Sequence, residues 1–210
     1  MSGTVERADG YHHGNLRRAL LDAAMEVLRE RGVDGLTLRE VARRAGVSHT
    51  APYHHFPDKG ALVSALAVES FERFTSTFRE AAAATAAAGG SHLDGVRAIG
   101  AVYVRFAFDD PERFKLMWRP ELRTVGDDSP VDEAGLASYQ VLLDEIAAGQ
   151  GTGEVREGDV GLLSLAAWAT VHGFATLIVD GPLRDQLPTW SDVEPLLEPV
   201  LDLAVRGLAP

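Results

Sequence analysis

The sequence predicts an all-α protein with a small N-terminal three-helix unit and a larger helical domain. Three observations support this prediction. Apolar residues recur at helical spacing through most of the 210 residues, no segment alternates like a strand, and Gly and Pro separate the periodic stretches. The composition, 46% hydrophobic and 24% charged, is that of a globular protein, so wholesale disorder and fibrous classes are excluded.

The first predicted helix covers residues 15–31, where apolar side chains recur at helical spacing as far as Gly32. Residues 1–13 show no such pattern, and we expect them to form a flexible tail. The N-terminal domain is expected to cover residues 14–60, and a second domain residues 61–210. A long helix that begins near the end of the first domain should link the two.

Two short helices joined by a turn follow in the N-terminal domain. Thr37 has the side chain of an N-cap, and Glu40 stands three residues later as its capping-box partner. Gly46 is expected to end this helix in the left-handed conformation, which glycine adopts without strain. Ser48 is expected to cap a third helix that ends near His54. Two short helices around a glycine-containing turn predict a helix-turn-helix.

Six further helices are expected in the second domain. They cover residues 61–88, 91–108, a short stretch after Asp110-Pro111, a stretch through Leu136, Leu143 and Ile146, residues 160–179, and residues 192–207. Gly149 to Gly153 is expected to be a flexible connection between two of them.

Residues 160–179 form the most apolar stretch, with twenty residues and no charged side chain. A stretch of this length satisfies the size criterion for a membrane span. Ser164, Thr170 and His172 interrupt it, however, and no cluster of basic residues flanks it. A helix that is apolar nearly all round is otherwise buried inside a protein, so we expect this one to be buried between subunits.

The net charge of −11 is not spread evenly along the chain. Residues 1–60 contain nine basic and eight acidic side chains and five of the seven histidines, whereas the other 150 residues contain eleven basic and 23 acidic side chains. A uniformly acidic protein would repel a nucleic acid. Only the second domain is acidic, so the N-terminal domain remains a candidate for binding DNA.

The segment 48–55 carries side chains that suit a DNA-reading helix. It is rich in hydrogen-bond donors and rings and has no acidic side chain to repel phosphate. Thr50 and Ala51 are small enough to let the backbone approach base edges, and their methyl groups could contact a thymine. Arg39 and Lys59, near the starts of neighbouring helices, could neutralise phosphates.

Residues 36–62, LTLREVARRAGVSHTAPYHHFPDKGAL, closely resemble the DNA-binding signature of the tetracycline-repressor (TetR) family of bacterial regulators. The preceding YHHGNLRRALLDAAMEVLRERG resembles the first helix of many members. The resemblance implies a recognition helix at residues 48–54, with Lys59 as a phosphate clamp. Pro52 departs from the family, which has an aliphatic residue there, and costs a backbone hydrogen bond at the fourth helical position. The implied DNA-binding residues are Thr37, Arg39, Ser48, His49, Thr50, Ala51, Tyr53, His54, His55 and Lys59.

Residues 166–174, AAWATVHGF, resemble the Trp-His-Gly motif of one subgroup of C-terminal domains in this family. The family carries an effector pocket among these helices, and Trp168, His172 and Thr176 share one helix face. The residues expected to line such a pocket are Phe106, Met117, Trp118, Trp168 and His172. The dimer contact is expected to join residues 160–179 and the last helix in a four-helix bundle across a two-fold axis. Its expected residues are Leu163, Ala167, Val171, Leu197 and Leu201.

Other classes of function find little support in the sequence. It contains no GxSxG, P-loop, GxGxxG or HExxH motif, which argues against an enzyme. It contains no cysteine, and neither His12-His13 nor His54-His55 comes with further ligands, so we expect no metal and no cofactor. No signal-peptide pattern opens the chain, and we expect a cytoplasmic location. One rival stays open, an all-helical ligand- or protein-binding module without sequence-specific DNA binding.

The sequence therefore predicts a homodimeric one-component transcriptional regulator, which in the family that it resembles is most often a repressor. A two-fold dimer would place its two recognition helices in successive major grooves of a near-palindromic operator. An unidentified small-molecule effector would bind residues 61–210, shift the helix that links the domains and release the DNA.

Overall fold

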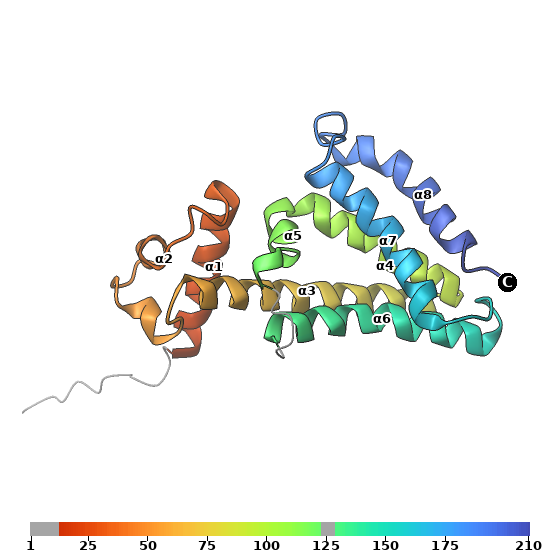
Figure 1. Ribbon diagram of the computed structural model, residues 1–210, viewed down its shortest axis with the longest axis horizontal. Helices are drawn as coiled ribbons and strands as arrows, with labels where there is room; N and C mark the ends of the chain where they lie inside the picture. Colours follow the sequence, from red (N-terminus) through yellow and green to blue (C-terminus); the bar gives the residue numbers. More distant parts are fainter. Residues whose placement is uncertain (1–12, 123–128) are drawn as a thin grey trace, which may run out of the picture. The chain divides into compact units, whose positions relative to one another are not determined.

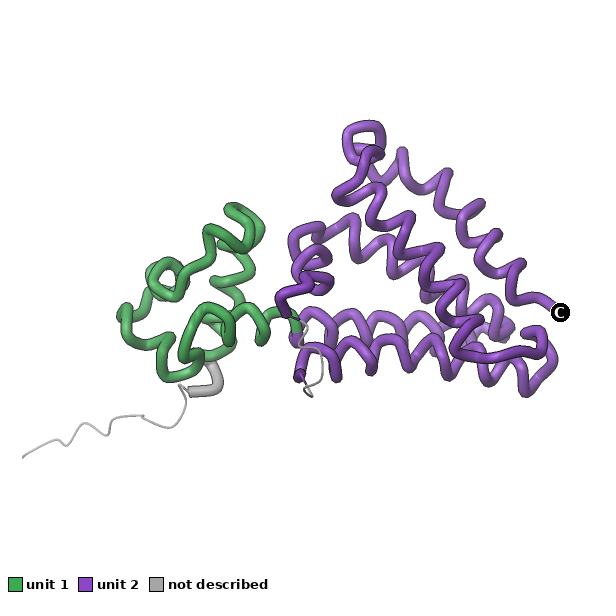
Figure 2. Tube along the Cα trace, viewed as in Figure 1, with its two compact units in different colours: residues 1–67 green, residues 68–210 purple. Residues whose placement is uncertain are grey.

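The structure of the protein, a computed structural model, describes residues 13–122 and 129–210. Regular structure in these ranges is helical throughout, which confirms the all-α prediction (Figure 1). The chain divides into two compact units, residues 1–67 and 68–210 (Figure 2). Most of the predicted N-terminal tail lies outside the described residues.

The first unit is built from helices α1 and α2 and the start of α3. α1 (His13–Arg31) ends at Gly32, whose φ of +65° is left-handed, and α2 (Leu38–Arg44) is followed by Gly46 with φ of +68°. α3 (Lys59–Ala87) starts in this unit and continues into the second. The core consists of apolar side chains from these helices and their connections, whose burial stabilises the unit. They include Leu20, Val27, Leu28, Leu36, Val41, Phe56 and Leu62.

The segment between α2 and α3 differs from the predicted helix of residues 48–54. Only Ala51–His54 is helical, as the short 3₁₀ helix η1. Pro52 occupies the second position of η1, where a missing N–H leaves no bond unmade, and its ring is buried. Its carbonyl accepts the backbone N–H groups of His55 and Phe56 at 2.9 and 2.8 Å. The expected loss of a backbone hydrogen bond at Pro52 is therefore avoided by a shorter and tighter turn.

One of the two hydrogen bonds of the predicted capping box forms at the start of α2. The Thr37 hydroxyl accepts the N–H of Glu40 at 3.1 Å, as the sequence predicts. The reciprocal half of the capping box is replaced, because the Glu40 carboxylate accepts two hydrogen bonds from the guanidinium of Arg43, at 2.6 and 2.8 Å. A charged donor one turn later is a stronger partner for these oxygens than a backbone N–H.

The second unit is a helical bundle with α4 (His92–Asp109) at its centre. α4 contacts α6 (Pro130–Thr152), α7 (Val160–Val179) and α8 (Trp190–Arg206). Figure 1 shows α3 running beside α6 in this unit, and a buried hydrogen bond of 2.7 Å between the hydroxyls of Thr75 and Ser138 joins these two helices. Helices α6, α7 and α8 therefore pack around α4, and α3 lies beside α6.

α5 (Pro111–Met117) is tied to α3 by a buried arginine, Arg113. Its N-cap, Asp110, binds the guanidinium of Arg113 at 3.0 Å, and the same guanidinium donates to the Ser70 hydroxyl at 3.1 Å. A buried guanidinium has to be paired, so this arrangement fixes α5 on α3. The 3₁₀ helix η2 (Pro120–Leu122) follows.

The prediction of a flexible connection over residues 149–153 is wrong. α6 continues to Thr152, and Gly153 then adopts the left-handed conformation with φ of +78°. Gly149 is buried inside the helix. A Cβ at this position would lie only 2.5 Å from Cγ2 of Val155, so there is no room for a side chain. This glycine permits a close approach between two segments instead of a flexible turn.

α7 has two different sides. Within the described residues, it is the one helix that is long and apolar enough to cross a membrane by length and composition, and less than half of that stretch is buried in the chain. One side packs in the unit through residues such as Leu163 and Phe174, whereas Leu162, Leu165 and Leu177 are exposed. The helix therefore has an apolar side that this chain alone does not cover.

Candidate functional site

The predicted DNA-binding residues lie at the start of α2, in the turn before η1, in η1 itself and at the start of α3. The exposed ones are Thr37, Arg39, Ser48, His49, Thr50, Tyr53 and His54, whereas Ala51, His55 and Lys59 are half-buried. The Tyr53 ring is 56% exposed, a large fraction for an aromatic side chain. The first unit therefore presents hydroxyls, imidazoles, a phenol and a guanidinium to solvent around its helix-turn-helix.

Three of these residues have particular surroundings within the unit. The Ser48 hydroxyl lies 3.1 Å from the Thr50 hydroxyl and does not cap a helix. Lys59 Nζ lies 3.5 Å from the carbonyl oxygen of Asp34, which brings the start of α3 to the loop before α2. Nε2 of His55 is buried without a hydrogen-bond partner among the described residues, so this ring is less available than those of its neighbours in η1.

An arginine of α2 holds that helix on α1. Arg44 binds Glu30 at 2.5 Å and Glu26 at 3.3 Å, and these acids lie one turn apart on α1. Its charge is therefore neutralised within the unit. Charge-assisted hydrogen bonds of this kind fix the angle between two helices more firmly than apolar contacts alone, because their geometry is directional.

Glu40 forms a second set of ion pairs, with Arg43 and Arg31. The hydrogen bond from Arg43 is the main cause that lowers the pKa of Glu40 from 4.5 to about 2, and Arg31 lies 3.4 Å away on the other side. Arg31 and Arg43 therefore help to stabilise the first unit. Arg39, exposed in the same helix, remains as a candidate for a phosphate contact.

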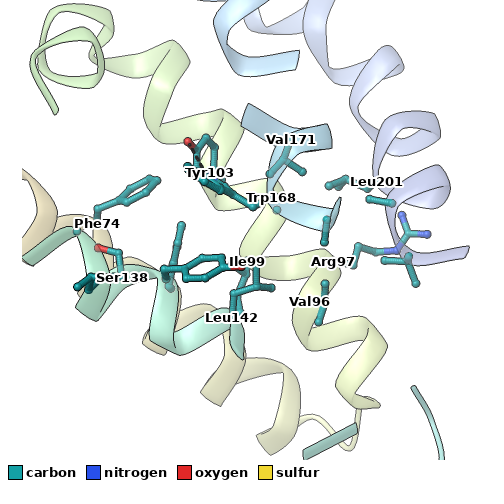
Figure 3. A pocket seen from close by; sticks show the side chains of 18 of the residues that line it. Phe74, Val96, Arg97, Ile99, Tyr103, Ser138, Leu142, Trp168, Val171 and Leu201 are labelled. Atoms are coloured by element: carbon teal, nitrogen blue, oxygen red, sulfur yellow. Dashed lines mark hydrogen bonds between the residues drawn. The ribbon is translucent and has the colours of Figure 1, made fainter. Parts of the chain in front are cut away.

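The second unit encloses a cavity of about 410 Å³, within the range of small-molecule sites (Figure 3). Its walls come from α3, α4, α6, α7 and α8, together with Trp118 at the end of α5. Most lining side chains are aromatic or aliphatic. They include Phe74, Tyr103, Trp118, Tyr139, Trp168 and Leu201.

A hydrogen-bonded group forms part of the cavity wall. Nε1 of Trp168 donates to the Tyr103 hydroxyl at 3.3 Å, and that hydroxyl lies 2.7 Å from Nδ1 of His172. Burial raises the pKa of Tyr103 above its ordinary value of 10.0, against a smaller opposite effect of the hydrogen bond from Trp168. The phenol is therefore neutral at physiological pH, and it ties α4 to α7.

The structure brings two of the predicted pocket residues, Trp118 and Trp168, to the cavity lining. It places the other three elsewhere. Met117 is fully buried in the core, Phe106 packs against the ring of Phe74 with a centroid distance of 4.8 Å, and His172 stands behind the wall as the partner of Tyr103. Thr176, on the same predicted stripe, is exposed.

Several lining residues escaped the sequence reasoning. Phe74, Phe78 and Tyr103 have the helical spacing of core residues, and that spacing does not distinguish a side chain that faces a cavity from one that faces another side chain. Ser138 and Tyr139 stand between the apolar positions of α6. The sequence gives no signal that these two residues line a cavity, because this depends on how α6 packs against α3 and α7.

The five predicted dimer-contact residues lie inside the second unit. The exposed fraction is at most 7% for each of them: Leu163, Ala167, Val171, Leu197 and Leu201. Side chains covered by their own chain cannot form the surface that meets a partner. The exposed apolar residues on the same two helices are Leu162, Leu165 and Leu177 on α7 and Leu196 and Leu203 on α8.

Known protein families match both units of the chain. The family described as "Bacterial regulatory proteins, tetR family" matches residues 20–66, and "Tetracyclin repressor-like, C-terminal domain" matches residues 96–204. The HTH-type transcriptional repressor AcnR of Corynebacterium glutamicum is 29% identical over 194 residues, which cover 90% of each chain. The class D tetracycline repressor protein of Escherichia coli is 46% identical over 57 residues, which cover 27% of this chain and 26% of that repressor.

A solved structure also resembles the whole chain. A protein of unknown function from Rhodococcus sp. RHA1 is 38% identical, with a TM-score of 0.80, and the match covers 96% of this chain and 100% of that one. A helix-turn-helix unit followed by a helical unit with a cavity defines a class of bacterial regulators, not of enzymes. The chain belongs to the tetR family of bacterial regulatory proteins.

Proposed function

We propose that the protein is a cytoplasmic, homodimeric transcriptional repressor that binds a near-palindromic operator and releases it when a small-molecule effector binds. One observation carries the DNA-binding part of the proposal. The helix-turn-helix exposes donors such as Thr37, Arg39, Tyr53 and His54, while the neighbouring Arg43 and Arg44 are paired with acids. The exposed groups are thus available for phosphates and base edges.

The proposed dimer contact uses the exposed apolar sides of α7 and α8. On α7, Leu162, Leu165 and Leu177 fall on one helix face, and on α8 Leu196 and Leu203 do so. Covering these leucines with the same face of a second copy would bury apolar surface in an isologous four-helix contact. The two-fold axis would pair the two recognition segments with two half-sites of one operator.

The proposed effector site is the cavity of the second unit. Phe74 and Phe78 of α3 line this cavity, and Lys59 is the first residue of the same helix. An effector that displaces α3 would change the spacing of the two recognition segments. It must bind the released state more tightly than the DNA-bound state, so it should raise the melting temperature of the free protein while it lowers operator affinity. An effector that tightened DNA binding would contradict release of the operator by the effector.

The DNA-binding proposal is tested by gel shift on the region upstream of the protein's own gene. The wild type should retard this fragment at low salt, and Tyr53→Ala should weaken binding by about tenfold or more, the scale of one lost base or phosphate contact. Because the Tyr53 ring is largely exposed, this variant should keep its fold, which circular dichroism checks.

A matched pair of variants separates a specific contact from net charge. Arg39→Ala and Arg79→Ala each remove one exposed positive charge, but Arg39 lies on α2 and Arg79 on the part of α3 in the second unit. Only Arg39→Ala should weaken the shift. If wild type shifts no fragment, or if the two variants lose equal affinity, the alternative of a helical binding module without specific DNA recognition is favoured.

A further inference from the structure

We infer that the cavity of the second unit binds a neutral, largely apolar molecule that contains a ring, and not a carboxylate, phosphate or ammonium ion. The inference specifies the effector class for the regulatory site proposed above. It depends on three features of the cavity: its rings, the state of its polar groups, and the charges that surround its one basic lining residue.

Rings dominate one part of the lining. Trp118 and Trp168 lie with ring centroids 5.5 Å apart, Tyr139 lies 5.7 Å from Trp168, and Phe74 lies 4.9 Å from Tyr103. All five of these residues line the cavity. Tilted and edge-to-face arrangements at these distances are the favourable geometries for aromatic contacts, which a ring of the ligand can extend.

The other part of the cavity is aliphatic. Figure 3 shows Phe74 and Ser138 on one side of the view and Leu201, Val96 and Arg97 on the other, with Tyr103 and Trp168 between them. The aliphatic wall comes from α4, α6, α7 and α8. A ligand that fills the space would therefore combine a ring with an aliphatic part.

The hydroxyls of the lining already have partners within the protein. Ser138 Oγ lies 2.7 Å from the Thr75 hydroxyl, Tyr139 donates to the carbonyl oxygen of Gly161 at 3.2 Å, and Tyr103 is held by Trp168 and His172. A ligand acceptor such as a carboxylate oxygen would have to break one of these bonds or remain unsatisfied by these hydroxyls. The lining hydroxyls are therefore not waiting donors for an anionic group.

Arg97 is the single basic residue among the described residues that line the cavity. Its guanidinium binds Glu198 at 2.8 Å and also Asp202, both on α8. These two carboxylates already neutralise the guanidinium, so this end of the cavity offers no unpaired positive charge. The other charged lining residue, Asp132, is an acid and adds no positive charge.

These charges decide against an anionic ligand. A carboxylate at the Arg97 end would have to compete with Glu198 and Asp202 for the same guanidinium, and elsewhere in the cavity it would lose its hydration without a charged donor in return. An ammonium group also loses hydration among the rings, and cation–π attraction at a buried site offsets only part of that loss. A neutral ligand has neither cost and keeps the gain from burying its apolar surface.

Three probes with one skeleton test the inference: phenylhexanol, phenylhexanoate and phenylhexylamine. Binding is followed by quenching of Trp118 and Trp168 in the full-length Trp190→Phe variant, which removes the third tryptophan, located outside the lining. Phenylhexanol should bind saturably and at least about tenfold more tightly than the other two probes. Equal or tighter binding of the acid or the amine, or no saturable binding of the alcohol, would overturn the inference.

A gain-of-function variant tests the role of the two acids. Glu198→Gln with Asp202→Asn frees the guanidinium of Arg97, so phenylhexanoate should bind about tenfold more tightly while phenylhexanol binding changes by less than about twofold. Glu194→Gln, which removes an exposed acid from the same helix, should change neither. Unchanged phenylhexanoate binding in a double variant that still binds the alcohol would contradict the assigned role of these acids. If the double variant does not fold, the order of the three probes on the wild type decides.

These outcomes are independent of DNA binding. Fluorescence titration reports occupancy of the cavity whether or not the protein binds an operator. A failed gel shift with the expected order of probes would remove the proposed repressor function and keep the ligand class. A positive gel shift with tighter binding of the acid would do the reverse.

Discussion

Glu40 shows how single residues keep the helix-turn-helix in shape. It is shared by Arg43 one turn later on α2 and by Arg31 at the end of α1. Together with the contacts of Arg44 to α1, these ion pairs fix α2 relative to α1 through charged hydrogen bonds. Arginines close to the recognition segment thus hold α2 and α1 together.

The lowered pKa of Glu40 predicts a specific loss of stability in acid. The pKa in the folded protein, about 2, lies below the ordinary value of 4.5, so the ionised carboxylate stabilises the fold above pH 4.5. This contribution is lost progressively as the pH falls from 4.5 towards 2. Glu40→Gln should be less stable than wild type at pH 7 and should lose less stability over that acid range.

Thermal unfolding followed from about pH 7 down to about pH 2.5, which crosses most of the interval between the two pKa values, measures this effect. Glu72→Gln, which alters an exposed carboxylate on α3, is the matched control and should follow the wild-type profile. A Glu40→Gln profile parallel to that of wild type would show that the ion pairs with Arg31 and Arg43 contribute nothing to the pH dependence of stability.

At the scale of helices, α6 offers two glycines with opposite expected effects. A Cβ at Gly149 would lie 2.5 Å from Val155 Cγ2 and 3.0 Å from Cβ of His92, whereas Gly151, two residues later, has no atom within 4 Å of such a Cβ. Gly149→Ala should therefore cost about 1–3 kcal/mol through overpacking. Gly151→Ala should be neutral or stabilising by up to about 1 kcal/mol, because alanine favours the helix.

Denaturant unfolding of the two variants checks this pair. A flexible connection over residues 149–153 would tolerate alanine equally well at both positions. Equal effects would therefore contradict the helical C-terminal end of α6, while a difference of the expected sign would support the contact between Gly149 and Val155.

The exposed leucines of α7 and α8 predict the assembly state. Leu165→Glu on α7 and Leu203→Glu on α8 would place a charge in the proposed apolar contact, and each should convert a dimer into a monomer. Leu136→Glu makes the same change at an exposed leucine of α6 and should leave the dimer intact. Sedimentation velocity distinguishes these outcomes, and a wild type that is monomeric at micromolar concentration would exclude the proposed contact.

Most helices could be predicted from the sequence because their ends carry local signals. Thr37, Gly46 and Ser91 all act at the helix ends where the sequence suggests a boundary. The errors arose where close packing decides the local structure. Pro52, whose ring is buried, lies in a 3₁₀ turn in place of a longer helix, and α6 continues as far as Thr152, with Gly149 packed against Val155.

The candidate site was predictable to different degrees in the two units. The DNA-binding residues lie in one continuous segment, so local sequence places them at α2, η1 and the start of α3. Cavity and dimer residues depend on which side of a helix meets its neighbours. Leu163 and Leu162 are adjacent and equally apolar, but one is buried and the other exposed, and periodicity on a helix that is apolar nearly all round cannot distinguish them.

At the scale of the whole molecule, the net charge of −11 resides in the second domain, while residues 1–60 are close to neutral. This distribution is compatible with a DNA-binding unit. It should weaken non-specific attraction to DNA and make affinity depend on two correctly spaced recognition segments. Because phosphate contacts release counterions, operator affinity should fall steeply as the salt concentration rises.

Recovery of fragments from a pool of the organism's genomic DNA tests the central claim most directly. Wild-type protein and Tyr53→Ala are incubated with the same pool at low salt, and the retained fragments are sequenced. The account predicts that wild type enriches fragments that share a near-palindromic element, and that Tyr53→Ala does not. Retention of no fragment by wild type, or of the same fragments by both proteins, would contradict sequence-specific DNA binding through this helix-turn-helix.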